Sequence, residues 1–313
     1  MPTSTIRILI IDEMHPSLFP MLDEIGAEAD YRPDIPPAEV RQALAGFDGL
    51  ILRSKVRVTA STLELAERLK FVARAGAGLD NIDVQALQDR SIALLGANEG
   101  NRQAVGEFTL GLLLALVRHI VRGDRQVRDK LWVREPNRGE EISGKMIGII
   151  GYGNMGQNFA RVLGGFNCRI LAYDCFAPEK VQPPAERVSL EELQAQAEVV
   201  SLHIPYIPEN LGLANDAFFE AFRKPIWFLN TSRGDVVDQA ALVRHLKSGK
   251  IKGAALDVLE NEKLQTFTTA QQENFGYLTA ADNVILTPHI AGWTHESYVK
   301  INEVLVGKIR QLL

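Results

Sequence analysis

Cysteine is almost absent from this 313-residue sequence, which contains only Cys168 and Cys175. The two residues form neither a CxxC pair nor a cluster with histidines, so we expect neither a disulfide framework nor a metal site. An excess of positive charge is also lacking, since the formal net charge is -5 and the pI is near 5.8. This balance argues against nucleic acid or an anionic membrane as the main partner, because both bind to a basic face.

Long hydrophobic runs are missing too. The most apolar run, residues 110–117, is much shorter than the roughly 18–20 apolar residues that a membrane helix needs. The N-terminal residues MPTSTIRILIIDE contain no cationic lead, long apolar core or small-residue cleavage site. We therefore expect a cytoplasmic protein without a membrane segment. The 46% of hydrophobic residues and the chain length are sufficient for two globular domains.

Short β-rich runs alternate with helical patterns in two series. In the first, strands are expected at 6–11, 49–53, 70–74 and 92–95, with helices beginning at Pro16 and Thr59. In the second, strands are expected at 146–150, 168–173, 199–204, 226–230, 253–258 and 283–287. Such alternation is typical of βαβ units on a parallel sheet. The predicted fold class is therefore α/β, with two doubly wound parallel-sheet domains.

Two helical segments bear on the domain boundaries. Residues 101–122 are too apolar for a surface helix, which favours a helix buried between the two domains. The polar residues 124–144 are expected at the surface. A last helical run, from about Thr294 to Leu313, is too short to form a domain, so we infer that it packs on the first one. The expected domains are thus 1–98 plus 290–313, and 99–289.

A glycine-rich turn indicates a dinucleotide site. Gly151, Gly153 and Gly156 lie in GYGNMG, directly between an apolar strand and a helical pattern. The first glycine allows a tight turn, the second lets the backbone approach a pyrophosphate, and the third permits close packing of helix on strand. The helix N-terminus, with Asn154 and Met155, offers unpaired N–H groups to the phosphates.

Asp174 ends the next predicted strand, near the spacing expected for a carboxylate that accepts hydrogen bonds from ribose hydroxyls. A carboxylate there repels a 2′-phosphate, which favours NAD over NADP as cofactor. The alternative is that Asp174 only caps a turn. A methyltransferase that uses S-adenosylmethionine can share the glycine turn and the acid, but it does not explain the residues downstream.

Three segments follow the ends of successive predicted strands: NTSRGDVVD (230–238), ALDVLENE (255–262) and TPHIAG (287–292). The carboxyl ends of parallel strands meet the ligand, so Arg233, Asp257, Glu262 and His289 are expected to converge. Such a set suits a 2-oxo acid. Arg233 can hold its carboxylate and carbonyl oxygens, His289 can exchange the proton, and Glu262 can stabilise the imidazolium.

These segments resemble the motifs of the D-isomer-specific 2-hydroxyacid dehydrogenase family, and the resemblance extends from about residue 50 to 300. It includes RAGAGLDNID (74–83) and LHIP (202–205). The resemblance implies a flavodoxin-like substrate domain, an inserted Rossmann NAD-binding domain, a cleft between them, and a homodimer. It implies that Arg233 binds the substrate carboxylate, that His289 is the acid/base, and that Glu262 is its partner.

The resemblance also implies contacts with the cofactor beyond the glycine turn and Asp174. These involve Ala77, Val105, His203, Ile204, Pro205, Thr231, Ser232, Arg233, Asp257, His289 and Gly292.

The substrate is indicated by residues 49–59 and 73–76, which resemble the 3-phosphoglycerate dehydrogenases of this family, enzymes of serine biosynthesis. That resemblance implies that Arg53 reaches a substrate phosphate, with Arg74 close by, because the planar arginine fork binds two oxygens. The further substrate contacts that it implies are Ser54, Ala75, Gly76 and Asn101. The alternative is that Arg53 and Arg74 are solvated residues at strand ends.

Other functions stay open. A hydroxypyruvate/glyoxylate or D-lactate type reductase is the next candidate, and an NAD-sensing binding protein is a candidate of another class. The complete Arg–Glu–His set argues against a role in binding alone.

The sequence also departs from the family pattern. Lys263 replaces the usual proline after the catalytic glutamate, an insertion covers residues 263–282, and Glu260 is a rival to Glu262. GANEGN at 96–101 replaces the usual NTP motif. Few residues follow His289, so we expect no C-terminal regulatory domain.

Overall fold

The computed structural model describes residues 5–313, and the chain divides into two compact units. Unit 1 comprises Met1–Arg102 and Trp293–Leu313, and unit 2 comprises Gln103–Gly292. Both boundaries lie only a few residues from those expected. The first unit is thus built from two separate stretches of the chain, and the second is inserted between them.

Unit 1 contains a five-stranded parallel sheet with the order β2-β1-β3-β4-β5. Its strands are β1 (Ile6–Ile10), β2 (Ala27–Tyr31), β3 (Gly49–Leu52), β4 (Phe71–Arg74) and β5 (Ala93–Gly96). This is the strand order of flavodoxin-like folds. Because every pair is parallel, the carboxyl ends of β3 and β4 lie at the same edge, which is where Arg53 and Arg74 are found.

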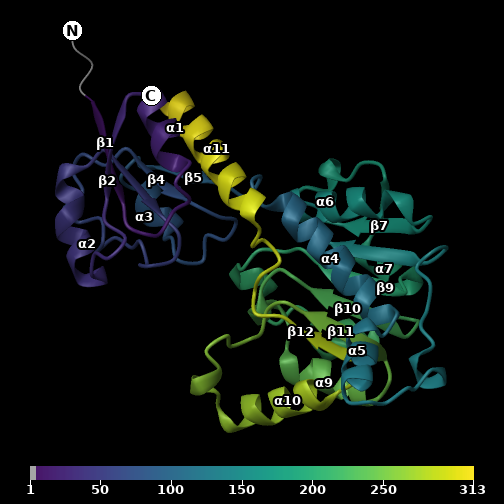
Figure 1. The fold of residues 1–313 in the computed structure, drawn as a ribbon. Helices are drawn as coiled ribbons and strands as arrows, with labels where there is room; N and C mark the ends of the chain where they lie inside the picture. Colours follow the sequence, from purple (N-terminus) through teal and green to yellow (C-terminus); the bar gives the residue numbers. More distant parts are fainter. Residues whose placement is uncertain (1–4) are drawn as a thin grey trace. The chain divides into compact units, whose positions relative to one another are not determined.

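The C-terminal helix belongs to unit 1. The helical elements of this unit are α1 (Leu18–Glu24), α2 (Pro37–Ala43), η1 (Leu44–Gly46), α3 (Val84–Gln88) and α11 (His295–Leu312). In α11, Leu305 and Ile309 are fully buried in the same core cluster as Ile8 and Ile10 of β1. Helix α11 lies against α1, at the opposite end of the sequence (Figure 1). This packing explains how so short a segment is stable.

Unit 2 contains a seven-stranded parallel sheet with the order β12-β11-β10-β9-β6-β7-β8. Its strands are β6 (Met146–Ile150), β7 (Arg169–Tyr173), β8 (Ala185–Arg187), β9 (Val199–Leu202), β10 (Ile226–Asn230), β11 (Ile251–Leu256) and β12 (Val284–Leu286). Numbered within the unit, this is the Rossmann order 3-2-1-4-5-6 with one added strand. The predicted fold class is confirmed.

Helices cover the sheet of unit 2 (Figure 1). They are α4 (Arg102–Val117), α5 (Ile120–Arg128), α6 (Asn154–Val162), α7 (Leu190–Gln196), α8 (Asp216–Glu220), α9 (Gln239–Lys247) and α10 (Thr269–Ala280). Short 3-10 turns are η2 (Glu135–Asn137), η3 (Leu163–Gly165), η4 (Pro178–Lys180), η5 (Pro208–Asn210), η6 (Gly234–Val236) and η7 (Leu264–Thr266). The two core clusters include Leu113 of α4 with Ile147 in one, and Leu193 of α7 with Leu242 of α9 in the other.

The helix predicted to begin at Thr59 is wrong, because turns follow this residue. Hydroxyl groups in this segment bind the nearby backbone. Thr62 donates to the carbonyl of Arg57 at 2.9 Å, and its own N–H donates to Thr59 Oγ1 at 3.4 Å. Such local hydrogen bonds compete with those of a helix.

The single helix predicted over residues 101–122 is also corrected. It breaks at His119, where φ is 55°, and α4 and α5 are bent by 63°. Helix α4 is buried against the sheet of unit 2 itself, whereas α5 has no buried residue. Within residues 5–313, no single helix is both long and apolar enough to cross a membrane, and α4 with α5 meets that test only as a bent pair.

Candidate active site

The three glycines of the turn after β6 are required for different reasons. Gly151 has a φ of +89°, and a Cβ there would overlap the carbonyl oxygen of His203. A Cβ at Gly156 would overlap the carbonyl oxygen of Gly151. At Gly153, in contrast, a Cβ would meet no atom of residues 5–313 within 4 Å. Packing inside the protein therefore explains the first and third glycines, while the second borders open space, as a backbone that approaches a pyrophosphate requires.

Helix α6 begins directly after this turn with Asn154 and Met155, both partly exposed. Its N-cap residue is Gly153, which has no side chain to cap the first turn. The N–H groups at the start of the helix are consequently free of a side-chain acceptor, and the helix dipole favours an anion there. The site fits the pyrophosphate of a dinucleotide.

Asp174, after β7, accepts three backbone hydrogen bonds. Tyr152 N, in the glycine turn, donates at 2.7 Å, and Phe176 N and Ala177 N donate at 3.0 and 2.8 Å. The carboxylate therefore joins the glycine turn to the loop after β7, which is the capping role considered from the sequence. It is only partly buried, and its contact with a ribose stays a prediction.

His203 is buried at the end of β9, with 9% of its surface exposed. Burial lowers its pKa to about 3, so the ring is neutral at physiological pH. Its Nε2 lies 2.9 Å from Ser201 Oγ, and within the described residues no group pairs with its buried Nδ1. Ile204, which also lies against Gly151, and Pro205 follow at the surface side. The backbone of His203 thus packs directly against Gly151 of the glycine turn.

The turn after β10 holds Arg233. The side chain of Asn230 accepts from Ser232 N at 3.0 Å and donates to the carbonyl of Arg233 at 2.8 Å. A Cβ at Gly234 would overlap the carbonyl oxygen of Leu259. The backbone on both sides of Arg233 is therefore fixed.

Helix α4 contacts this turn through its threonine. Thr109 Oγ1 lies 3.0 Å from Thr231 Oγ1 and donates to the carbonyl of Val105 at 2.7 Å. All three residues are buried. Thr109 therefore links the two predicted cofactor residues, Val105 and Thr231, through hydrogen bonds.

Asp257 organises the loop that carries His289. Its side chain is buried, with 1% exposed, and accepts from Ile290 N at 3.0 Å and Ala291 N at 2.8 Å. Thr287 Oγ1 donates to the same carboxylate at 2.5 Å. The backbone N–H of His289 donates to the Asp257 carbonyl at 2.8 Å. This positioning role was not predicted from the sequence, which indicated a cofactor contact.

His289 and Glu262 form a pair. Nδ1 of His289 lies 2.8 and 3.0 Å from the two carboxylate oxygens of Glu262. Both side chains are almost half exposed, at 45% and 47%. Because Glu262 occupies Nδ1, Nε2 is left for a ligand. In the part of the chain that the structure describes, Glu260 makes no such contact.

The predicted substrate residues of unit 1 lie around the ends of β3 and β4. Arg53 N donates to Asp12 Oδ2 at 2.7 Å, and Ser54 is exposed. The guanidinium of Arg74 lies over Gly76, where a Cβ would overlap it. Ala75 is buried, and Ala77 is partly buried.

Asn101 and Gly292 complete the predicted set. The buried Oδ1 of Asn101 has no hydrogen-bond partner among residues 5–313, so it can accept a hydrogen bond from a ligand. Gly292 is the last residue of unit 2. Sequence reasoning missed supporting residues, among them Asp12, Thr109, Asn230, Thr287 and Tyr298, whose hydroxyl accepts a hydrogen bond from Arg53. The place of Asn230 at a strand end was the only available signal.

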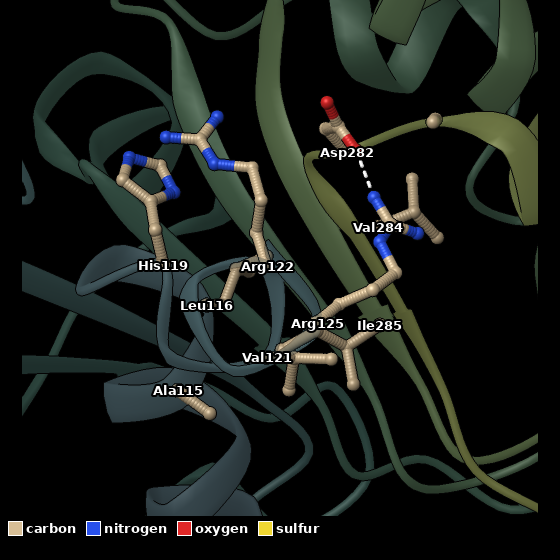
Figure 2. A pocket seen from close by; sticks show the side chains of 10 residues that line it. Ala115, Leu116, His119, Val121, Arg122, Arg125, Asp282, Val284 and Ile285 are labelled. Carbon is tan, nitrogen blue, oxygen red and sulfur yellow. Dashed lines mark hydrogen bonds and ion pairs between the residues drawn. The ribbon is translucent and has the colours of Figure 1, made fainter. Parts of the chain in front are cut away.

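A pocket in unit 2 lies away from these motifs. It is lined by Ala115, Leu116, His119, Val121, Arg122, Arg125, Ala281, Asp282, Val284 and Ile285. Figure 2 shows Arg125 paired with Asp282 at its rim. Asp282 and Val284 are at the amino end of β12, whereas Arg233 and His289 follow the carboxyl ends of β10 and β12. The pocket is therefore at the edge of the sheet opposite to the predicted catalytic residues.

Comparison with known proteins places this arrangement in a family. The family model for the D-isomer specific 2-hydroxyacid dehydrogenase, NAD binding domain, matches residues 110–291. The hydroxypyruvate reductase of Thermotoga maritima is 35% identical over 271 residues, which cover 87% of this chain and 86% of that protein. The chain belongs to the D-isomer-specific 2-hydroxyacid dehydrogenase family. It is an NAD-dependent dehydrogenase, as predicted.

Two other members of this dehydrogenase family are informative. The D-3-phosphoglycerate dehydrogenase of Methanocaldococcus jannaschii is 32% identical over 314 residues. The alignment covers 98% of this chain but 57% of that protein, so the chain spans little more than half of its length. The crystal structure of D-lactate dehydrogenase from Aquifex aeolicus, complexed with NAD and lactic acid, has a TM-score of 0.80 and 25% identity, and covers 97% of this chain and 94% of that one.

Proposed function

We propose that this dehydrogenase interconverts a D-2-hydroxy acid and a 2-oxo acid, and that its substrate pair is 3-phosphoglycerate and 3-phosphohydroxypyruvate, as in serine biosynthesis. The observation that carries the reaction type is the pairing of His289 Nδ1 with Glu262 at 2.8 Å. This pairing leaves Nε2 of His289 available to a substrate. Arg233 follows the carboxyl end of another strand of the same sheet. Residues in this arrangement suit proton transfer at a carbonyl oxygen.

The residues have distinct roles in the proposed reduction. When bound, NADH supplies the hydride for the carbonyl carbon. Arg233 holds the substrate carboxylate, because its fork matches two oxygens. Protonated His289 gives the proton at Nε2 to the carbonyl oxygen, and Glu262 stabilises the imidazolium through Nδ1. Oxidation needs the neutral ring of His289 as the base.

The phosphorylated substrate is supported by Arg53. Its backbone is fixed at the end of β3 by Asp12, and its side chain is partly buried. Within residues 5–313, no carboxylate forms a salt bridge with this guanidinium, so its charge is available to a phosphate.

The test is the oxidation of NADH by the purified protein with 3-phosphohydroxypyruvate, hydroxypyruvate, glyoxylate and pyruvate, each supplied separately. We expect the phosphorylated acid to be preferred by at least about a hundredfold in kcat/KM, because a charge-assisted phosphate contact contributes several kcal/mol. Arg53→Ala should remove this preference. A wild-type preference for an unphosphorylated acid would contradict the proposed substrate but not the reaction type. No activity with any of the four acids would favour an NAD-sensing binding protein.

Hydroxypyruvate reduction is the second candidate. The Thermotoga maritima protein named for that activity is 35% identical and matches this chain over 86% of its own length, whereas the phosphoglycerate dehydrogenase from Methanocaldococcus jannaschii matches over only 57%. The same assay separates the two candidates, because hydroxypyruvate differs from 3-phosphohydroxypyruvate only by the phosphate.

We further propose that the protein is a homodimer joined through α5 and the segment after it. This surface carries exposed apolar side chains that are costly in water. They are Ile120, Val121, Val127, Leu131, Trp132 and Val133. Trp132, with 81% exposed, is the most prominent. In sedimentation experiments, Trp132→Asp should shift the protein to the mass of a monomer, whereas Leu312→Asp in unit 1 should not. An unchanged mass for Trp132→Asp would contradict this interface.

A further inference from the structure

The guanidinium of Arg53 lies in a corner formed by two aromatic rings. Its Cζ is 4.5 Å from the ring centroid of Trp293 and 4.7 Å from that of Tyr298. The two rings are 5.1 Å apart and almost perpendicular, at 83°. Nη1 of Arg53 also donates a hydrogen bond to the Tyr298 hydroxyl. Both cation–π attraction and a directional hydrogen bond therefore fix this side chain.

The backbone of Arg53 is fixed as well. Its N–H donates to Asp12 Oδ2 at 2.7 Å, and its carbonyl accepts from Asn81 Nδ2 at 3.3 Å. Asp12 Oδ2 also accepts from Lys55 N at 3.3 Å. Asp12 is thus bound to main-chain N–H groups rather than to the guanidinium.

The aromatic corner has a rigid support of its own. Helix α11 begins with a capping box between Thr294 and Ser297. Further along, Asn302 donates to the carbonyl of His15 at 3.1 Å. A Cβ at Gly100 would lie 2.7 Å from Ile301 Cα, so the helix packs closely against the backbone of unit 1. The ring of Tyr298 is therefore carried by a helix that packs on the core of unit 1.

One edge of the guanidinium is left for a ligand. Among the described residues, Nε and Nη2 of Arg53 have no acceptor, and no Asp or Glu lies within salt-bridge distance. This Nε–Nη2 edge is the fork that binds two oxygens of a phosphate or carboxylate. A partly buried cation without an anionic partner attracts such a group.

We propose that Trp293 and Tyr298 are positioning residues that hold Arg53 with its Nε–Nη2 edge directed toward a second anionic group of the substrate. The inference rests on the proposed 2-oxo acid reduction and names the substrate class, a 2-oxo acid with a distal phosphate or carboxylate. The physical gain is preorganisation, because an arginine that is already ordered loses little side-chain entropy when it binds. The rings thereby decide selectivity without touching the reacting carbon.

The first experiment compares Tyr298→Phe, which keeps the ring and removes the hydroxyl, with Tyr31→Phe as a matched control. Tyr31 is an exposed tyrosine of unit 1 whose ring packs on Phe19. We expect Tyr298→Phe to raise KM about three- to tenfold for the doubly anionic substrate, with kcat within about twofold, because one hydrogen bond to a charged group is lost. KM for hydroxypyruvate should not change.

Trp293 is tested by Trp293→Leu, with Trp293→Phe as the conservative variant. We expect the leucine variant to raise KM for the doubly anionic substrate about tenfold and the phenylalanine variant to restore most of the loss, because an aromatic face is what the cation contacts. Equal loss in both variants would overturn the cation–π part of the inference.

A second readout does not depend on substrate. The Nε–Hε signal of Arg53 in NMR spectra, assigned by its absence in Arg53→Ala, should exchange slowly with water in the wild-type protein and faster in Tyr298→Phe. Tyr31→Phe should leave it unchanged. An Arg53 signal that is equally mobile in all three proteins overturns the inference, whatever the substrate is.

Assays with three substrates distinguish failure of this inference from failure of the proposed function. Assays use 3-phosphohydroxypyruvate, oxaloacetate as a dicarboxylic 2-oxo acid, and hydroxypyruvate. If oxaloacetate is preferred and Tyr298→Phe raises KM for oxaloacetate but not for hydroxypyruvate, the positioning role stands and the phosphorylated substrate is wrong. If 3-phosphohydroxypyruvate is preferred but Tyr298→Phe equals the Tyr31→Phe control, the proposed function stands and the positioning role is overturned. A preference for hydroxypyruvate overturns both.

Discussion

The two units support their functional residues in different ways. In unit 2, short-range polar contacts fix the backbone, as when Asn230 bonds to the carbonyl of Arg233 three residues later. The loop of His289 is fixed by Asp257, which lies on the neighbouring strand end. In unit 1, the side chain of Arg53 is held by Trp293 and Tyr298, from the other end of the chain.

This difference corresponds to two requirements. Proton transfer demands a fixed geometry, which buried backbone hydrogen bonds provide. Recognition of a distal anion demands only that one charged group be preorganised, and aromatic packing is enough for that. If Arg53 binds the distal anion as proposed, substitution at the aromatic corner changes substrate preference and leaves the turns of unit 2 intact.

The largest effect is expected at His289. His289→Gln removes the acid/base proposed for the reaction, and should lower kcat about 10²–10⁴-fold. NADH affinity, measured by fluorescence titration, should change little. Steady-state kinetics with the preferred substrate provides the test, and a loss of less than about tenfold would show that another group transfers the proton.

Asp257 tests whether the polar network of unit 2 is needed for catalysis. Asp257→Asn weakens the acceptor for Ile290 N and Ala291 N. We therefore expect kcat to fall about tenfold or more and the free energy of unfolding to fall by about 1–3 kcal/mol. Asp282→Asn is the control, because that carboxylate is exposed and, among the described residues, forms a salt bridge with Arg125 only. Equal effects of the two substitutions on kcat would argue against a positioning role.

The glycine turn provides a contrast within unit 2. Gly151→Ala should destabilise the protein by more than about 1 kcal/mol, because its φ is +89° and the new methyl group would overlap the carbonyl of His203. Gly153→Ala should leave the melting temperature unchanged and raise KM for NADH about tenfold, since only the pyrophosphate would meet the methyl group. An unchanged KM in Gly153→Ala would mean that the cofactor lies elsewhere.

His203 predicts a dependence of stability on pH. In the folded protein burial lowers its pKa to about 3, whereas in the unfolded chain it titrates near pH 6.5. Between these values the unfolded state binds the additional proton, so stability falls as the pH falls below about 6.5, by up to ~1.4 kcal/mol per pH unit.

Denaturant unfolding from about pH 6.5 to 5 measures this slope, above the range in which carboxylates titrate. His203→Gln should flatten the slope, and His295→Gln, at an exposed position, should not. A slope that His203→Gln does not alter would assign the acid sensitivity to other groups. Glu140 contributes to the pH dependence of stability only below this range. Burial opposes ionisation of its carboxyl, but Lys145 and Lys252 bind the carboxylate and lower its pKa to about 2.

The sequence allowed much of unit 2 to be predicted. The strands at 146–150 and 226–230 are found as expected, because each is an apolar run that ends at a turn signal. Buried parallel strands and close glycine packing leave few alternatives, so such local patterns suffice. For the same reason the residues around His289 and Arg233 could be named as a set.

Unit 1 was harder to predict. Strand β2, AEADY, is mostly polar and lies at the edge of its sheet, so it lacks the apolar signal of a buried strand. The aromatic corner around Arg53 depends on contacts between residues 245 positions apart, as for the hydrogen bond to Tyr298, and no local pattern reports them. Tertiary packing decides these features.

The smallest effect concerns the insertion after Glu262, which forms η7 and α10. Thr268 and Gln271 form a capping box at the start of α10, and the helix packs on α9, where the Lys247 ammonium lies 4.8 Å from the ring centroid of Tyr277. Thr268→Ala removes the cap and should lower the free energy of unfolding by about 0.5–2 kcal/mol without changing kcat.

Thr279→Ala, at an exposed position of the same helix, is the control. If kcat also falls in Thr268→Ala, the stability of α10 affects the position of Glu262, and the insertion contributes to catalysis. If only stability changes, α10 contributes to the stability of the fold but not to the position of Glu262.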